Sequence, residues 1–312
     1  MDNLYRKCLI VYNPMSGKGI SDDIIEKYKI ILEENGYEVD LLPTQYSNHA
    51  FDALQETGNY DIVFSIGGDG TLNEVVSGNF KRDEELTICP LPSGTCNDVS
   101  TMLGFGNDPI ENLNMALTGE VNEMDIATIN DKPFVYVACI GKFTNIPYET
   151  SSERKRKEGY IAYMKNIIPE IISGLQTYEA EVTVDGVKLD DSYSIIMFSN
   201  SNHIAGIGNF YKDISLDDGA MEVLLCKSET RIELLREFIK FIMGIESDDL
   251  ISLKAHEVSV KLLDKPEKNW CVDGEELVSD TDEYQVEVKN KMKFLTPTKN
   301  ANQLFKNGKN RI

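Results

Sequence analysis

The chain has 312 residues, of which 41% are hydrophobic and 27% are charged, as expected for one large or two ordinary globular domains. Its net charge of −21 argues against a nucleic-acid-binding protein, which would need a basic face to meet phosphates. Its apolar runs are shorter than the roughly 20 residues that span a membrane. The N-terminus has no signal-peptide pattern, and the six cysteines form no CxxC pair. These features indicate buried free thiols in a reducing cytosol and disfavour a zinc site.

Strands and helices alternate through the first part of the chain. Residues 8–12 form an apolar strand candidate, and residues 21–36 form a helix with Ser21 as its N-cap and Gly36 at its end. The alternation continues with strands at 37–42, 60–66 and 86–91, and with short helices at 50–57 and 96–104. This order predicts an α/β domain with a mostly parallel sheet and helices on both faces.

The pattern changes near Asp125, after which strand candidates follow one another with few helices. One hairpin has Asp185-Gly186 at its turn, and helices are expected near 159–175 and 230–243. A sandwich or barrel fits this half, and we expect an antiparallel β-sandwich. We therefore predict an α/β domain at residues 1–126 and a β-rich domain at 127–293, with residues 294–312 packing back on the first domain.

A glycine-rich loop, SIGGDGTLNEVVSG at residues 65–78, follows an apolar strand. Gly67, Gly68 and Gly70 leave room for a ligand beside the backbone, and a helix N-terminus attracts anions. The carboxylate of Asp69 would repel a phosphate unless a divalent cation bridges the two. The pattern Thr71-x-x-Glu74 is that of a capping box, so a helix should begin just after the glycines. Taken alone, the loop fits a tight turn equally well.

Two other loops favour a ligand site over a simple tight turn. Residues 13–19 and 91–98 each join an apolar strand to a Gly/Ser/Thr-rich turn that opens a helix. Such loops meet at the carboxyl edge of a parallel sheet, where ligands bind. Together they indicate a nucleotide site, although neither loop has the spacing of a Walker A motif.

The three loops together resemble the catalytic domain of the diacylglycerol kinase and sphingosine kinase superfamily, most closely its soluble bacterial diacylglycerol kinases. The Gly-Gly-Asp-Gly-Thr element alone is shared with NAD kinases and phosphofructokinases, whose nucleotide-binding fold is expected here. Cys96 and the segment VSTMLG (99–104) depart from the usual pattern. The resemblance extends through residues 139–163, 215–223 and 272–276, and its core motifs are Asn13-Pro14-x-Ser16-Gly17-Lys18, Gly67-Gly68-Asp69-Gly70-Thr71-x-Asn73-Glu74 and Ser93-Gly94-Thr95-x-Asn97-Asp98.

The resemblance implies an ATP site in which Asp69 holds the catalytic Mg²⁺ on the phosphates. Thr44 and Asp98 belong to that set, although each also fits a helix cap on sequence alone. The full set is Asn13, Pro14, Met15, Ser16, Gly17, Thr44, Gly67, Gly68, Asp69, Gly70, Thr71, Leu72, Asn73, Glu74, Thr95 and Asp98.

Two acidic segments of the second half complete the implied site. The resemblance places the general base at Glu275, directly after Asp273-Gly274, rather than at Glu276; a hairpin turn with exposed acids is the alternative. It also implies a structural Mg²⁺ site with the Asp218 side chain and the carbonyls of Ser215 and Ala220 as ligands. Asp217 and Asp125 would orient bound waters there, and an ordinary Asp-Gly turn is the alternative.

The implied activity is that of an ATP-dependent lipid kinase, most directly one that converts diacylglycerol to phosphatidic acid. Three kinds of alternative stay open. The acceptor could be a sphingoid base, ceramide or phosphatidylglycerol, the protein could be an NAD kinase, or it could be a non-enzymatic nucleotide- or lipid-binding protein. The basic cluster Arg154–Lys157 beside an apolar helix predicts peripheral contact with a membrane, the alternative being a core helix after a solvated loop. We expect a cytoplasmic protein, and a homodimer stays open.

Overall fold

The computed structural model describes residues 6–14, 20–141, 175–204, 208, 210, 211, 213–266 and 269–306, and it separates into two compact units. Unit 1 comprises residues 1–126, 213–218 and 290–312, and unit 2 comprises residues 127–212 and 219–289. The sequence placed 213–218 in the second half, but backbone hydrogen bonds hold it in unit 1. The Leu216 N–H donates to the Leu304 carbonyl at 2.8 Å, and the Leu216 carbonyl accepts from the Asp125 N–H at 2.7 Å.

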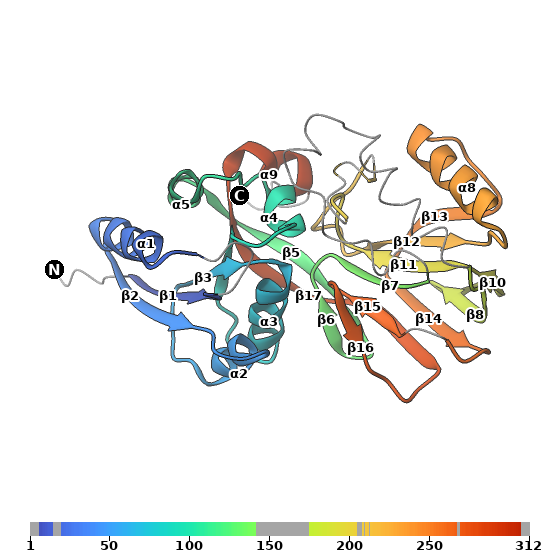
Figure 1. Ribbon diagram of the computed structural model, residues 1–312, viewed down its shortest axis with the longest axis horizontal. Helices are drawn as coiled ribbons and strands as arrows, with labels where there is room; N and C mark the ends of the chain where they lie inside the picture. Colours follow the sequence, from blue (N-terminus) through green and yellow to red (C-terminus); the bar gives the residue numbers. More distant parts are fainter. Residues whose placement is uncertain are drawn as a thin grey trace. The chain divides into compact units, whose positions relative to one another are not determined.

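Unit 1 contains a parallel sheet with strands in the order β4-β3-β1-β2 and the last part of β17 beside β4. α2 and α3 pack together on one side of it, and α1 and α5 lie on the other (Figure 1). β3 is buried along its whole length because helices cover both faces. The strands are β1 (Arg6–Tyr12), β2 (Tyr37–Pro43), β3 (Ile62–Gly67), β4 (Thr87–Pro92) and β17 (Glu283–Thr296), and the helices are α1 (Asp22–Glu34), α2 (His49–Glu56), α3 (Asp69–Phe80), α4 (Asp98–Leu103), α5 (Pro109–Leu117) and α9 (Thr298–Leu304).

Unit 2 is a β-sandwich. Its six-stranded sheet is antiparallel, with the order β13-β12-β11-β7-β15-β16, and its other sheet has β10-β8-β14-β17 in line. The strands of the six-stranded sheet are β7 (Val137–Gly141), β11 (Ile195–Ser199), β12 (Met221–Cys226), β13 (Leu250–Ala255), β15 (Trp270–Val272) and β16 (Glu275–Leu277). The remaining strands are β5 (Glu120–Ile129), which begins in unit 1, β6 (Lys132–Phe134), β8 (Tyr178–Val184), β9 (Val187–Lys188), β10 (Asp191–Tyr193) and β14 (Glu257–Leu262).

The core of unit 2 is built from alternate residues of both sheets. Trp270 lies at its centre, fully buried, with its ring centroid 5.6 Å from that of Phe198 and 5.2 Å from that of Tyr284. Ala138 and Ile140 of β7 face the same core, so Cys139 between them faces the opposite side of the sheet. The predicted combination of an α/β unit and an antiparallel sandwich is confirmed.

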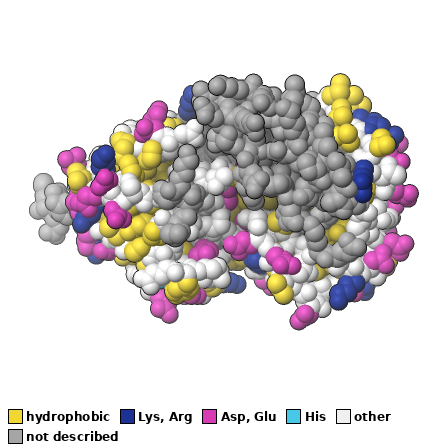
Figure 2. Space-filling view, viewed as in Figure 1, with side chains coloured by type: hydrophobic (Ala, Val, Ile, Leu, Met, Phe, Trp, Pro, Cys, Tyr) yellow, Lys and Arg dark blue, Asp and Glu magenta, His cyan; other side chains and the backbone are white. Residues whose placement is uncertain are grey.

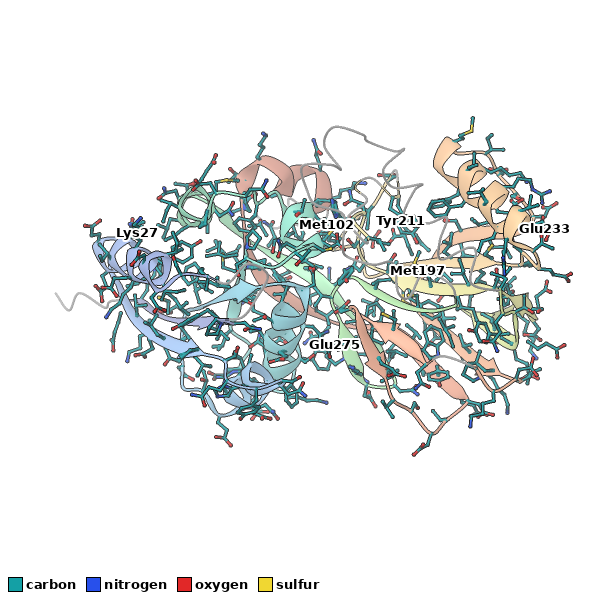
Figure 3. All side chains as sticks on the ribbon, viewed as in Figure 1. Lys27, Met102, Met197, Tyr211, Glu233 and Glu275 are labelled. Atoms are coloured by element: carbon teal, nitrogen blue, oxygen red, sulfur yellow. The ribbon has the colours of Figure 1, made fainter. Side chains whose placement is uncertain are left out.

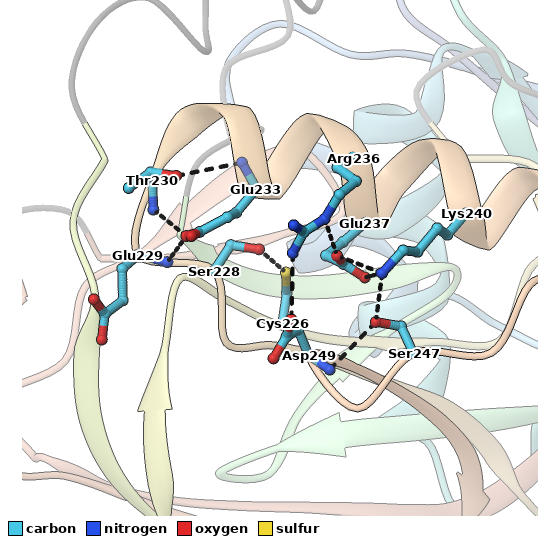
Figure 4. Close-up of polar contacts among 10 residues, drawn as sticks. All are labelled: Cys226, Ser228, Glu229, Thr230, Glu233, Arg236, Glu237, Lys240, Ser247 and Asp249. Carbon is cyan, nitrogen blue, oxygen red and sulfur yellow. Dashed lines mark hydrogen bonds and ion pairs between the residues drawn. The ribbon is translucent and has the colours of Figure 1, made fainter.

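Helix α8 (Arg231–Met243) carries a polar network on unit 2 (Figure 4). A capping box of Thr230 and Glu233 fixes its first turn. The Glu237 side chain is completely buried, and its carboxylate accepts from Arg236 Nε at 2.8 Å and Lys240 Nζ at 2.9 Å. Burial alone would raise the pKa of Glu237, but hydrogen bonds from Ser247, Lys240 and Arg236 outweigh it and lower the pKa to about 2.

Glu237→Gln is expected to lower the free energy of unfolding by about 2 kcal/mol at pH 7, because Lys240 and Arg236 lose their shared anion. The pKa of Glu237 is depressed in the folded state, so its contribution is complete above its ordinary value near 4.5 and disappears as the pH falls toward about 2. Urea unfolding of both proteins at pH 7 and pH 3 measures this difference. Glu246→Gln, at an exposed position after the helix, is the control. An equal difference at both pH values would contradict the assignment.

Candidate active site

Three loops meet at the carboxyl edge of the unit 1 sheet. The Asn13 N–H donates to the Ile66 carbonyl at 3.2 Å, which ties the loop after β1 to the end of β3. The Gly67 carbonyl accepts from the N–H groups of Ser93 at 2.9 Å and Gly94 at 3.2 Å, which ties the loop after β4 to the same point. The structure therefore brings the described parts of all three predicted motifs to one place.

Glycine is required where these loops touch. A Cβ atom on Gly67 would lie 2.4 Å from the Thr71 Cβ, and one on Gly94 would lie 2.4 Å from the Gly68 Cα. Neither neighbour can move away cheaply, because the first belongs to a β-branched side chain and the second to the backbone. Glycine at position 94 therefore lets the loop after β4 pack directly on the backbone at the start of α3.

The start of α3 differs from the prediction. The capping box Thr71-x-x-Glu74 does not form: the helix begins at Asp69, and Gly68 is its N-cap. The Glu74 carboxylate instead accepts from the N–H groups of Asn48 at 2.9 Å and Ala50 at 3.1 Å, and so caps the N-terminus of α2. The prediction was wrong because α3 packs against α2, whose own N-cap residue supplies no side-chain hydrogen bond. Gly68, the N-cap residue, supplies no side-chain hydrogen bond to α3, so the first N–H groups of this helix are suited to an anion.

Asp69 lies where α3 and α4 begin. Its Oδ1 accepts from the Val99 N–H at 3.4 Å, in the first turn of α4. Asn97, the residue before that helix, has a φ of 55° and exchanges hydrogen bonds of 2.9 and 3.0 Å with the backbone of Gly94. Asp98, the first residue of α4, is fully buried. Two helix N-termini thus lie beside the Asp69 carboxylate.

The other predicted ATP residues take different places. The Thr44 N–H donates to the Tyr12 carbonyl at 2.8 Å, so Thr44 lies beside the end of β1. Thr71, Leu72 and Asn73 are buried in α3, and the Leu72 N–H donates to the Gly68 carbonyl at 3.1 Å. Pro14 and Thr95 are exposed on their loops, whereas Met15, Ser16 and Gly17 lie outside the described residues.

Ser93 belongs to one of the three sequence motifs, but the sequence analysis assigned it no role in the ATP site. Its Oγ is buried and has no hydrogen-bond partner among the residues that the structure describes. A buried hydroxyl normally finds a partner, and a phosphate oxygen would supply one here. The α3 N-terminus, with glycine as its N-cap, suits a phosphate as well, and a carboxylate such as Asp69 suits Mg²⁺. The described residues at this edge therefore fit a magnesium–nucleotide complex.

Glu275 follows a tight hairpin turn in unit 2 (Figure 3). Asp273 has a φ of 49° and Gly274 a φ of 90°, as in the two-residue turns that match strand twist. Glu275 is exposed at the first position of β16. Glu276 differs, because its Oε1 accepts from the Asn269 side chain at 2.7 Å. The structure thus distinguishes the two neighbouring glutamates by their partners.

Asp273 anchors this turn, a role that the sequence analysis missed. Its buried carboxylate accepts from the N–H groups of Val135 at 2.6 Å and of Tyr136 and Val137 at 3.0 Å each. Its own N–H donates to the Val137 carbonyl at 2.8 Å. The hairpin that carries Glu275 is therefore fixed to β7 at its turn. The Asp-Gly pair signalled a turn, but nothing local signalled the three distant donors.

The predicted structural Mg²⁺ site already contains a cationic side chain. Lys291 Nζ lies 3.4 Å from Asp125 Oδ1 and donates to the Asp217 carbonyl at 2.6 Å. Asp217 Oδ1 accepts from the Ser215 hydroxyl at 2.8 Å and from the Lys306 N–H at 3.0 Å. Among the described residues, no three His, Cys, Asp or Glu side chains form a metal-binding group. The implied site depends on Asp218 and on the carbonyls of Ser215 and Ala220, and it stays a prediction.

Comparison with known proteins decides the family. A relative from Staphylococcus aureus (strain JH9), named diacylglycerol kinase, is 30% identical over 234 residues, which are 73% of this chain and 73% of the relative. The chain belongs to the diacylglycerol kinase family. Residues 7–129 match the model "Diacylglycerol kinase catalytic domain", and residues 148–289 match "YegS C-terminal NAD kinase beta sandwich-like domain".

Two further comparisons agree with membership of the diacylglycerol kinase family. A diacylglycerol kinase from Bacillus subtilis (strain 168) is 29% identical over 276 residues, covering 86% of this chain and 90% of the relative. A crystal structure of a diacylglycerol kinase from Bacillus anthracis str. Sterne matches with a TM-score of 0.75 at 24% identity, covering 95% of this chain and 98% of that one, which supports the fold. The predicted family, its fold and its lipid-kinase class are confirmed.

Proposed function

We propose that this chain transfers the γ-phosphate of ATP to the free hydroxyl of diacylglycerol and so forms phosphatidic acid. The observation that carries the proposal is the carboxyl edge of the unit 1 sheet, where three features meet: the α3 N-terminus with glycine as its N-cap, the buried Ser93 hydroxyl, which has no hydrogen-bond partner among the described residues, and Asp69. That arrangement suits a polyphosphate with its metal. The choice of lipid is supported by the relatives that are named diacylglycerol kinase.

Each part of the edge has a task in this proposal. The first N–H groups of α3 and the Ser93 hydroxyl hold phosphate oxygens, and Gly68 and Gly94 keep side chains out of their way. The Asp69 carboxylate holds Mg²⁺, which when bound neutralises the charge on the phosphates. The Val99 N–H in the first turn of α4 holds Asp69 in place.

Glu275 is proposed as the general base on the strength of the family resemblance. Its carboxylate accepts the proton of the acceptor hydroxyl as that oxygen bonds to phosphorus. The anchored turn at Asp273 supports this role, because a base must be held at a fixed position to act on one hydroxyl.

Incubation of the full chain with radiolabelled ATP, Mg²⁺ and mixed micelles tests the function. Separate micelles contain diacylglycerol, ceramide, a sphingoid base or phosphatidylglycerol, and NAD is added without lipid as a further acceptor. We expect labelled phosphatidic acid from diacylglycerol at a rate well above the other products. Preferential labelling of another lipid would replace the substrate, and labelling of NAD alone would overturn the lipid kinase proposal.

We further propose that the kinase meets its lipid as a peripheral membrane protein. The predicted basic cluster Arg154–Lys157 lies outside the described residues, but α8 offers a second surface. Ile232, Ile239 and Met243 share one face of this helix and are 82%, 37% and 65% exposed. Figure 2 shows hydrophobic side chains next to Lys and Arg side chains in this region, and Arg236 flanks the apolar face. Such a face suits an anionic bilayer. Among the described residues, no helix is long and apolar enough to cross one.

The double substitution Ile232→Ser and Met243→Ser is expected to weaken binding to phosphatidylglycerol-containing vesicles about tenfold, since inserted apolar area is lost. Co-sedimentation with vesicles of increasing anionic content measures it. Val121→Ser with Val187→Ser removes two valines that are 52% and 60% exposed elsewhere, and this control should bind as the unmodified chain does. Equal binding by both double variants would exclude α8 as the contact.

A further inference from the structure

Cys139 and Cys271 lie directly opposite each other on two neighbouring strands. β7 and β15 are antiparallel, and their register pairs Cys139 with Cys271. The Asp273 N–H donates to the Val137 carbonyl at 2.8 Å, so these two residues lie at a hydrogen-bonded position of the ladder. Hydrogen-bonded and non-hydrogen-bonded pairs alternate along an antiparallel ladder. Cys271 and Cys139 are two residues away along their strands, so they form a hydrogen-bonded pair, in which the Cα atoms are about 5.5 Å apart. That spacing falls within the range of disulfides.

Both thiols are on the same face of the sheet. The neighbours Ala138 and Ile140 on β7, and Trp270 and Val272 on β15, face the core of the sandwich. Cys139 and Cys271 therefore point to the other face, and both are only partly buried. Cys8, Cys89 and Cys226 are fully buried, and Cys96 is in unit 1. Of the six cysteines, these two alone are paired by strand register.

The two thiols are chemically unequal. A hydrogen bond from Cys139 lowers the pKa of Cys271, and the Gly274 N–H acts in the same direction, against the effects of burial and of the nearby carboxylates of Asp273 and Glu275. The same contact raises the pKa of Cys139. The thiolate therefore forms at Cys271, with Cys139 positioned as the second thiol.

We propose that Cys139 and Cys271 form a thiol-modification site, which a small-molecule disulfide oxidises to an intramolecular disulfide. The Cys271 thiolate attacks one sulfur of the small disulfide, forming a mixed disulfide and releasing one thiolate. Cys139, losing its proton to solvent, then attacks the Cys271 sulfur and releases the second. Two cysteine thiols are oxidised, and one small disulfide is reduced to two thiols. An excess of small thiol reverses both steps.

The site lies on the hairpin that the kinase proposal uses. Cys271 is two residues before Asp273 and four before Glu275, so a bond to β7 pulls on the strand that positions Glu275. This consequence rests on the proposed base role. Closing the bridge brings the sulfurs to about 2 Å from each other. We therefore expect the oxidised form to turn over more slowly, with recovery on reduction.

The full chain is incubated with oxidised glutathione, alkylated with iodoacetamide, digested and analysed by mass spectrometry. We expect a peptide pair linked through Cys139 and Cys271, which dithiothreitol separates. Cys139→Ser should stop at a glutathione adduct on Cys271, and Cys271→Ser should leave Cys139 unmodified over the same time. Cys226→Ser, which alters a buried thiol on β12, should still form the link.

Full alkylation of Cys139 and Cys271 after that incubation, or adducts spread evenly over the six cysteines, would overturn the site. Turnover of the linked and reduced forms is measured on the same samples. A linked form with unchanged turnover would overturn the effect on the hairpin. Because the linked peptide is detected without any kinase assay, absence of turnover in the reduced protein would count against the proposed function and not against the site.

Discussion

Asp69→Asn is expected to lower kcat about a thousandfold, because the side chain keeps its shape but loses the charge that holds Mg²⁺ on the phosphates. The asparagine Oδ1 can still accept from the Val99 N–H, as the Asp69 Oδ1 does at 3.4 Å. The contact between the starts of α3 and α4 is thus preserved. The loss of activity should therefore occur without a large change in the thermal unfolding temperature.

The metal dependence separates this role from a structural one. Activity is measured in mixed micelles over a range of Mg²⁺ concentrations, and the variant should need more Mg²⁺ as well as turning over more slowly. Asp69→Cys supplies a soft ligand, so Mn²⁺ or Cd²⁺ should restore part of its activity where Mg²⁺ does not. An unchanged Mg²⁺ dependence of Asp69→Asn, with a normal unfolding temperature, would contradict the assignment of the metal to Asp69.

Much of the fold could be predicted because its signals are local. Alternating apolar strands and amphipathic helices gave the parallel sheet of unit 1, and the change of pattern near Asp125 gave the sandwich. The glycine loops could be recognised for the same reason, because a glycine between a strand and a helix is often required where a side chain would not fit. Gly67 and Gly94 confirm that cause, because neither position has space for a Cβ.

Features that depend on distant partners could not be predicted. Glu74 had the spacing of a cap for its own helix, yet its carboxylate bonds to Asn48 and Ala50 of α2. The segment 213–218 belongs to unit 1 through Leu216, whose partners are 91 residues earlier and 88 later in the chain. Asp273 likewise needs donors from residues 135–137. A local pattern shows that a group can form such bonds, and only the fold shows with which partner.

Glu275→Gln is expected to lower kcat between about a hundredfold and ten-thousandfold, as loss of a general base does, while the KM for ATP changes little. The amide has nearly the shape of the carboxylate but cannot take up the proton of the acceptor hydroxyl. Glu275 is exposed and begins β16, so the substitution should not disturb the core.

The adjacent glutamate provides a matched control for this change. Glu276→Gln alters the same hairpin and removes the same charge, but the Glu276 carboxylate is held by the Asn269 side chain at 2.7 Å. It should keep most of the activity, because its role is to join two neighbouring strands. If the two variants lose activity equally, the effect belongs to the charge or stability of the hairpin rather than to proton transfer. A normal kcat for Glu275→Gln beside a slow Glu276→Gln would move the base to Glu276, and the anchored turn at Asp273 would then position that residue instead.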